Sequence, residues 1–445
     1  MNRIHFIAIG GAAMHNLAIA LKKKGYQVTG SDDEIFEPAK SHLEKHGLLP
    51  LRFGWSESKI KGDIDAVILG MHARPDNPEL LKAKKLGLKI FSYPEYLFEQ
   101  TKNKKRVVIA GSHGKTTITA MIIHVLHHQE WPVDFMVGSQ LEGYESMVSL
   151  SEKADIAVFE GDEYLSSPLD LRPKFIHYKP DIALISGIAW DHINVFPTFD
   201  KYVEQFRALV EMIHENGHLV YYGGDNTMNR LTKYANDKVF TQPYQEHPNV
   251  EKGKQTYLVL PDGKEVSVMV FGKHNMQNIS GAKTVCNILG LTDLQFYEGI
   301  STFPGTSKRL QVLEQKDSFS KYLDFAHSPS KVRATVQAVR QKYPDRKLIT
   351  VLELHTFSSL NKDFIPQYSG TLDTADEAVV YYDENVLIHK KLNSIPEAFV
   401  KKSFQYQNLK IIMKKEVLEQ YLKQVEKQNT VLLLMSSGNF SGIKL

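Results

Sequence analysis

The segment Val107-Val108-Ile109-Ala110-Gly111-Ser112-His113-Gly114-Lys115-Thr116-Thr117 decides how the rest of this 445-residue chain is interpreted. Four apolar residues typical of a buried strand lead into a glycine-containing turn, and residues 118–128 follow with helical spacing. This order is typical of a phosphate-binding loop. Its glycines let backbone N–H groups surround a phosphate, the new helix offers unpaired amides, and the lysine adds a positive charge. The strict motif has a glycine where this chain has Ile109, so the loop is a shortened variant.

Length and composition indicate a globular protein with two or three domains. Apolar residues make up 42% and charged residues 24% of the chain, and the net charge of +3 is too balanced to predict a nucleic-acid partner. A single cysteine, Cys286, excludes an internal disulfide and is typical of a reducing compartment. No apolar run is long enough for a membrane span. We therefore expect a cytoplasmic protein that acts on small anionic molecules.

The residues before the loop predict a βαβ unit. A strand over residues 3–9 leads into the turn Gly10-Gly11, a helix follows, and a second strand ends at Ser31-Asp32. This arrangement is found in Rossmann-like nucleotide-binding units, but the G-x-G-x-x-G sequence is absent, so a nucleotide site and plain sheet architecture both stay open. A further strand, residues 65–70, leads into a loop that contains His72.

Strands and helices keep alternating to the end of the chain, which predicts an α/β protein of three domains. The basic segment 101–106 is interpreted as a linker, and Phe303-Pro304-Gly305 marks a second boundary. We expect a Rossmann-like domain over residues 1–103, a central P-loop domain with a mostly parallel sheet over 104–308, and a Rossmann-like domain over 309–445.

Two polar residues at strand ends add chemistry to the phosphate loop. Glu160 ends one predicted strand and His192 follows another, so both are expected beside Thr116 at the carboxyl edge of the central sheet. A carboxylate, a hydroxyl and an imidazole there suit Mg²⁺ that bridges ATP phosphates. Taken singly, Glu160 could be a surface acid and His192 a buried structural histidine. Their joint placement favours the metal site.

Six motifs in this order resemble the Mur ligases, the ADP-forming amide ligases of bacterial cell-wall precursor synthesis, over essentially the whole chain. These motifs are Gly-Ser-His-Gly-Lys-Thr-Thr (111–117), Phe-Glu-Gly-Asp-Glu-Tyr (159–164), Trp-Asp-His (190–192), Gly-Lys-His-Asn-Met-Gln-Asn (272–278), Gly-Thr-Ser-Lys-Arg-Leu (305–310) and Asp-Phe-Ala-His-Ser-Pro (324–329).

The resemblance implies a role for each matching residue. Lys115, Glu160, His192 and Arg309 are implied as the catalytic set, and Thr116, Glu160 and His192 as ligands of two Mg²⁺ ions. The implied ATP-binding residues are Gly111, Ser112, His113, Gly114, Lys115, Thr116, Thr117, His274, Asn275, Asn278, Arg309 and Asp324. UDP-N-acetylmuramate is expected at Gly10, Gly11, Ser31, Asp32 and His72, and the amine substrate at His327 and His355.

The implied reaction joins a carboxylate to an amine. ATP phosphorylates the carboxylate, and the amine then displaces phosphate from the resulting acyl phosphate. Residues 204–207 lack the lysine that several relatives carbamylate, which resembles the subgroup that acts directly on UDP-N-acetylmuramate. Within it, one activity adds L-alanine in new synthesis, and another adds L-alanyl-γ-D-glutamyl-meso-diaminopimelate in peptidoglycan recycling. The ending, residues 433–442, resembles the subgroup that adds the tripeptide and therefore favours it.

Some positions depart from the family pattern. Gly187 and Ala189 replace the usual Asn and Glu, Leu323 replaces an acid, and Ser328 replaces a histidine. The last two changes keep open a catalytically inert nucleotide sensor, although a sensor needs no second metal ligand. A plain P-loop ATPase is the third possibility, but it needs neither of the flanking domains.

Overall fold

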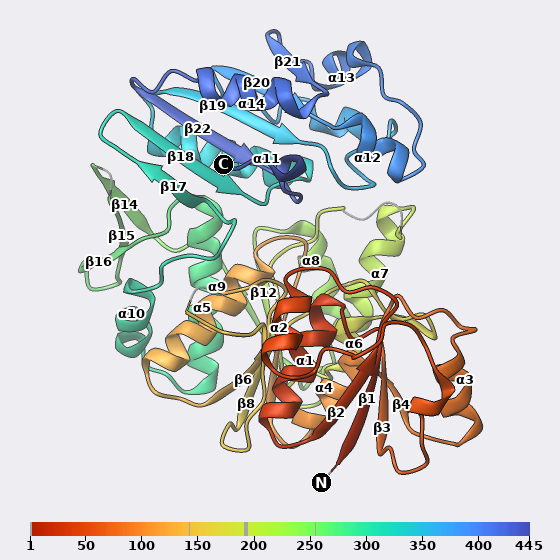
Figure 1. The fold of residues 1–445 in the computed structure, drawn as a ribbon. Coiled ribbons are helices and arrows are strands. Elements are labelled where there is room, and N and C mark those ends of the chain that lie inside the picture. Colours follow the sequence, from red (N-terminus) through yellow and green to blue (C-terminus); the bar gives the residue numbers. More distant parts are fainter. Residues whose placement is uncertain (1, 142, 191–194, 254) are drawn as a thin grey trace.

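The computed structural model describes residues 2–141, 143–190, 195–253 and 255–445. It has three sheet-based domains, and the third lies beyond the middle domain from the first (Figure 1). The first domain holds a parallel sheet in the order β2-β1-β3-β4. Its elements are β1 Arg3–Ile7, α1 Ala12–Lys23, β2 Gln27–Ser31, α2 Ala39–Lys45, η1 Glu57–Lys59, β3 Ala66–Leu69, α3 Pro78–Lys85, β4 Ile90–Ser92 and α4 Tyr93–Thr101.

The middle domain is built on a seven-stranded sheet in the order β13-β12-β11-β5-β8-β6-β7, parallel except for β7. Strand β5 lies at its centre, and its residues from Arg106 onward are buried, as their apolar run predicts. The elements are β5 Lys105–Ala110, α5 Lys115–His128, β6 Val133–Met136, β7 Val148–Ser149, β8 Ile156–Glu160, β9 Leu165–Ser167, β10 Asp170–Pro173, α6 Lys174–His177, β11 Ile182–Ile185, α7 Phe199–Glu211, β12 His218–Tyr222, α8 Asn226–Leu231, η2 Thr232–Tyr234 and β13 Phe240–Tyr244.

A small antiparallel sheet and two helices complete the middle domain. The sheet contains the predicted hairpin at Pro261-Asp262-Gly263, and α9 packs along α5 (Figure 1). These elements are β14 Asn249–Lys252, β15 Gln255–Val259, β16 Glu265–Val268, α9 Lys273–Leu289 and α10 Asp293–Ser301.

The third domain has a six-stranded sheet in the order β17-β18-β22-β19-β20-β21, parallel except for β17. Its elements are β17 Gln311–Gln315, β18 Phe319–Asp324, α11 Pro329–Lys342, β19 Lys347–Glu353, η3 Ile365–Tyr368, β20 Glu377–Tyr381, α12 Glu384–His389, α13 Glu397–Phe404, β21 Leu409–Ile412, α14 Lys415–Gln424, β22 Thr430–Met435 and η4 Phe440–Gly442. The predicted α/β class with three sheet domains is confirmed. Among the described helices, none combines the length and apolarity that crossing a bilayer requires.

Candidate active site

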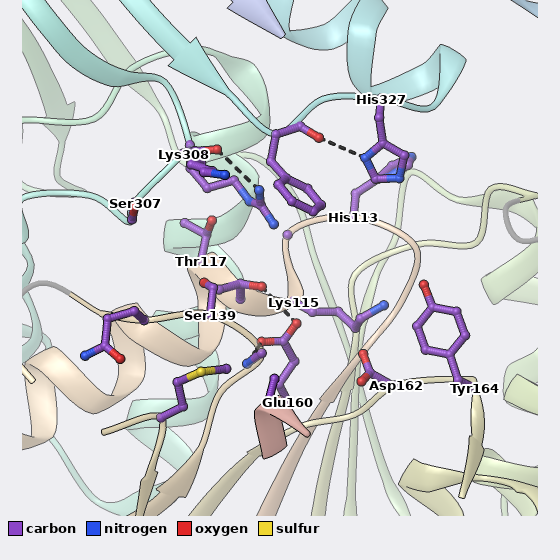
Figure 2. A pocket seen from close by; sticks show the side chains of 18 of the residues that line it. His113, Lys115, Thr117, Ser139, Glu160, Asp162, Tyr164, Ser307, Lys308 and His327 are labelled. Carbon is purple, nitrogen blue, oxygen red and sulfur yellow. Dashed lines mark hydrogen bonds between the residues drawn. The ribbon is translucent and has the colours of Figure 1, made fainter. Parts of the chain in front are cut away.

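All three domains contribute to one cavity of about 1620 Å³. The volume exceeds the roughly 300–1,000 Å³ of a pocket for one drug-sized ligand, so it has room for two substrates together. The phosphate loop forms its centre. Figure 2 shows Lys115, Glu160 and Asp162 on one side of the loop and Lys308 and His327 of the third domain facing it from the other.

The phosphate loop is shaped by two glycines with left-handed backbone angles. Gly111 has φ of 120° and Gly114, which precedes α5, has φ of 73°. A Cβ atom at Gly111 would collide with Ser186, and one at Gly114 would collide with the side chain of Asn278 on α9. Other residues are excluded at both positions because they would be strained and would also lack space. The loop therefore presses directly against β11 and α9.

Lys115 is held by acids in this structure. Its Nζ donates to Glu163 Oε2 at 2.8 Å and to the carbonyl of Gly111 at 2.9 Å. Burial would lower the pKa of Lys115, but Glu163 and Asp162 outweigh burial and raise it above its usual value. These two bonds use two of its three ammonium protons, so a phosphate in the loop would share or replace Glu163 as its partner.

Thr116 and Glu160 form an oxygen-rich pair beside the loop. Thr116 Oγ1 donates to Glu160 Oε1 at 2.8 Å, and the backbone N–H of Gly138 donates to Glu160 Oε2 at 2.6 Å. Burial raises the pKa of Glu160, and Asp162 raises it further. A dication would favour the charged carboxylate, and Mg²⁺ prefers such oxygen donors. These residues fit Mg²⁺. The third predicted ligand, His192, lies outside the described residues.

Arg309 and Asp324 lie where the middle domain joins the third. The Arg309 guanidinium stacks on the ring of Phe325 at 4.4 Å, and both Arg309 and Asp324 line the cavity. Asp324 accepts hydrogen bonds from the N–H groups of Leu310 and Ala326, each at 2.7 Å, so its carboxylate organises the connection. Burial lowers the pKa of Arg309, while Asp324 acts in the opposite direction.

The other predicted nucleotide residues surround the loop. Ser112 Oγ lies 2.9 Å from the hydroxyl of Tyr202, and His113 Nε2 lies 2.9 Å from Ser330 Oγ of the third domain. The predicted residues that line the cavity here are Ser112, His113, Gly114, Lys115, Thr116, Thr117, Glu160, His274, Asn275, Asn278, Arg309 and Asp324. Burial lowers the pKa of His274, while Asp324 acts in the opposite direction.

The first-domain end of the cavity contains Gly10, Gly11, Asp32 and His72. Asp32 Oδ2 accepts from the N–H of Gly10 at 2.7 Å, which fixes the glycine turn. Burial raises the pKa of Asp32 to about 6. A turn with its N–H groups at the end of β1 is a suitable place for a diphosphate.

Two predicted substrate residues are not part of the cavity wall. Ser31 is fully buried and its Oγ donates to Glu79 Oε1 at 2.8 Å, because consecutive residues of an extended chain face opposite sides. His355 lies against Glu353 and Gly438, beneath the C-terminal turn. His327, in contrast, lines the cavity. The structure does not bring Ser31 and His355 to the cavity, and their roles stay predictions.

Several residues of the site were not singled out from the sequence. Glu163, behind the cavity wall, holds Lys115 and accepts from the hydroxyl of Tyr202 at 3.0 Å, and Asp162, which lines the cavity, pairs with Lys174 at 3.2 Å. Lys308 also lines the cavity, and its Nζ donates to the carbonyl of Gly438 at 3.2 Å. All three belong to motifs quoted above, 159–164 and 305–310, so membership of those motifs was the signal that could have found them.

Comparisons with known proteins agree with this geometry. The sequence matches the Mur ligase family catalytic domain over residues 3–105, the Mur ligase middle domain over 109–286 and the glutamate ligase domain of Mur ligases over 308–438. It is 31% identical to a UDP-N-acetylmuramate–L-alanine ligase of Clostridium botulinum strain Langeland, over 85% of this chain and 82% of the relative. The chain belongs to the Mur ligase family. It is an ATP-dependent ligase of peptidoglycan synthesis.

Solved structures of Mur ligases share the fold. A UDP-N-acetylmuramate–alanine ligase from Thermotoga maritima superposes with a TM-score of 0.73 at 22% identity, over 99% of this chain and 97% of that one. A UDP-N-acetylmuramate:L-alanyl-γ-D-glutamyl-meso-diaminopimelate ligase from Neisseria meningitides superposes with a TM-score of 0.60 at 25% identity, over 68% of this chain and 98% of that one.

Proposed function

We propose that this Mur ligase joins the carboxylate of UDP-N-acetylmuramate to the amino group of L-alanine, with ATP as the energy source. The observation that carries the proposal is the single cavity that joins the Gly10-Gly11 turn, the phosphate loop and the third domain. A carboxylate from one end and an amine from the other can meet at the terminal phosphate of ATP. The Clostridium botulinum relative supports L-alanine as the amine, instead of the tripeptide that the C-terminal sequence favours.

The first step needs the negative charge of the phosphates to be neutralised while a carboxylate oxygen attacks. Lys115 moves from Glu163 to the phosphates, and Arg309 approaches them from the domain junction. Thr116 and Glu160 would hold Mg²⁺, which would supply positive charge against the transferring phosphoryl group. Glu160 and His192 stay the predicted ligands of a second ion, and His192 lies outside the described residues. These charges act in a buried cleft, where they stabilise a transition state more than they do in water.

The second step needs the acyl phosphate to be kept from water until the amine arrives. The third domain faces the phosphate loop through Lys308 and His327 (Figure 2). The amine attacks the acyl carbonyl carbon, the C–O bond to phosphate breaks, and the amine loses a proton as the amide forms. Closure of the third domain over the loop excludes water during this step.

The tripeptide L-alanyl-γ-D-glutamyl-meso-diaminopimelate is the second candidate amine. The turn after β22 favours it, because Glu353 accepts from the N–H of Phe440 at 3.0 Å and Lys308 reaches Gly438. These bonds hold the C-terminal turn beside the third-domain end of the cavity. A tripeptide is long enough to reach this turn, whereas L-alanine is not. The Neisseria meningitides structure, whose enzyme uses this tripeptide, supports the same alternative.

An ADP-release assay with UDP-N-acetylmuramate and either L-alanine or the tripeptide tests the proposal. We expect release to require both substrates and kcat/KM to be higher with L-alanine, with the conjugate verified by mass spectrometry. A higher kcat/KM with the tripeptide would replace L-alanine by the second candidate. ATP turnover without either substrate, or none under any condition, would contradict the ligase assignment itself.

A further inference from the structure

A second group of possible metal ligands lies outside the cavity, where the first domain packs against the middle domain. Glu95 is on α4, Asp170 begins β10 and His177 ends α6. One donor atom from each residue lies within 4.8 Å of the other two. Helices α4 and α6 pack against each other (Figure 1), and none of the three residues lines the cavity.

His177 is the residue that points to a ligand here. The residue is only 6% exposed, and its Nε2 makes no hydrogen bond, although it lies 3.2 Å from Asp170 Oδ2. Leaving a buried polar atom without a partner costs about 1–3 kcal/mol, so native proteins rarely do so. A metal ion bound to Nε2 would satisfy this nitrogen.

Each carboxylate has one oxygen near the imidazole. Glu95 Oε2 caps α4 by accepting from Ser92, whereas Oε1 lies 3.9 Å from His177 Nδ1, so Glu95 must shift to share an ion with Nε2. Asp170 Oδ2, the oxygen nearest Nε2, accepts from Arg172 Nη2 at 2.6 Å. The Arg172 side chain is 62% exposed, so it can release Oδ2 to an ion and keep the bond from its Nε to Oδ1 at 2.9 Å. A carboxylate that binds a metal through one oxygen and a hydrogen-bond donor through the other is a common arrangement in metal sites.

We propose that Glu95, Asp170 and His177 bind a divalent transition-metal ion, for which Zn²⁺ is the probe, and that this ion links α4 to α6. One imidazole nitrogen and two carboxylate oxygens leave a fourth tetrahedral position for water. Ligands about 2.0–2.2 Å from one tetrahedral ion lie roughly 3.4 Å apart, close to the distance between His177 Nε2 and Asp170 Oδ2. A nitrogen donor favours Zn²⁺ over Mg²⁺ or Ca²⁺. The role is structural and separate from the ligase reaction.

Zinc titration of the full chain tests the proposal. The protein is stripped with a chelator and titrated by calorimetry in millimolar Mg²⁺, which occupies the Thr116–Glu160 site. We expect one Zn²⁺ per chain and a higher Tm with Zn²⁺ than without it. Co²⁺ in its place should give visible absorption bands. His177→Gln, Glu95→Gln and Asp170→Asn, made separately, should each weaken Zn²⁺ binding by about 100-fold or more, beyond the usual effect of losing an outer partner.

The matched control is His124→Gln. His124 and His128 are one turn apart on α5, with ring centroids separated by 6.5 Å, and form the alternative surface pair that could capture Zn²⁺. Binding that survives all three site substitutions, or that is lost only in the control, would overturn the proposal, as would no binding at all. If His177→Gln does not fold, loss of the Co²⁺ bands in Glu95→Gln still decides the question.

Discussion

The two contacts that the middle domain makes with its neighbours differ in kind. With the first domain it shares one apolar core, in which Tyr93 and Leu97 of α4 pack in the same cluster as Phe175 and Tyr178. The hydroxyls of Tyr93 and Tyr178 lie 3.2 Å apart inside it. With the third domain it makes polar contacts such as His113–Ser330, and the side chain of Phe271 enters the apolar cluster of the third domain.

The difference indicates which part of the molecule moves. A large apolar interface fixes two domains, whereas a small polar one permits relative motion. The third domain has its own apolar cores and touches the middle domain through the ring of Phe271, 5.8 Å from that of Tyr322, and through Lys342 and Glu251 at 3.2 Å. We infer that the first and middle domains form one body, over which the third domain opens and closes.

The largest effect is expected on kcat, from a substitution in the phosphate loop of the middle domain. Lys115→Ala should lower kcat by about 10³-fold, because the phosphates lose a buried positive charge. The Tm should also fall, because the buried Glu163 loses the partner that neutralises it, so the loss of kcat is measured at a temperature where the variant is folded. Steady-state ADP release measures the first quantity and calorimetry the second. Lys179→Ala, an exposed lysine outside the cavity wall, is the control. Normal turnover in Lys115→Ala would remove the lysine from the mechanism.

The second-largest effect is expected on stability, from a cavity made in the apolar core that the first and middle domains share. Phe175→Ala should lower the free energy of unfolding by about 3–5 kcal/mol, because a fully buried ring leaves a cavity between two domains. Phe271→Ala removes the same side chain from the contact with the third domain, so it should cost less stability and mainly raise KM. Denaturant titration measures the free energy of unfolding, and steady-state kinetics measure KM. Equal losses of stability in both variants would contradict the claim that the two interfaces of the middle domain differ in kind.

A smaller effect concerns the acid that holds the lysine. Glu163→Gln should destabilise the nucleotide-free protein by about 3 kcal/mol, because Lys115 would be buried without its partner. MgATP should then raise the Tm more in this variant than in the unmodified protein, since its phosphates supply the missing charge.

Asp162→Asn is the matched control for Glu163→Gln. Asp162 pairs with Lys174, so its loss removes one nearby negative charge without releasing Lys115. Thermal unfolding with and without MgATP separates the two variants. An equal rise in Tm on adding MgATP to both variants would show that the total negative charge near the loop, and not the Lys115–Glu163 pair, governs nucleotide binding.

The smallest effect is expected at the polar contact. Ser330→Ala removes the hydroxyl that meets His113, and should change the free energy of unfolding by no more than about 1 kcal/mol. It should nevertheless shift the orientation of the third domain, which small-angle scattering can follow with and without substrates. A large loss of stability would mean that this contact is as strong as the apolar one.

The local parts of the site were predictable from the sequence because residues adjacent along the chain determine them. Strand β5, the loop glycines and α5 follow from residues next to one another, and the strand that ends at Glu160 follows from an apolar run. The pairing of Lys115 with Glu163 and of His113 with Ser330 depends on how distant segments meet, which no spacing reveals. Ser31 was predicted because it is next to Asp32 in the sequence. Neighbouring residues of an extended chain face opposite sides, so Ser31 is buried away from the cavity that Asp32 lines.

The close approach of Gly114 to Asn278 has a consequence for substitutions in the phosphate loop. A Cβ atom at residue 114 would collide with the carboxamide of Asn278, which itself donates a hydrogen bond to Asn275 Oδ1 at 3.3 Å. A side chain at residue 114 would therefore displace the amide pair on α9 as well as strain the loop, so damage in the loop would reach two of the predicted ATP-binding residues at once.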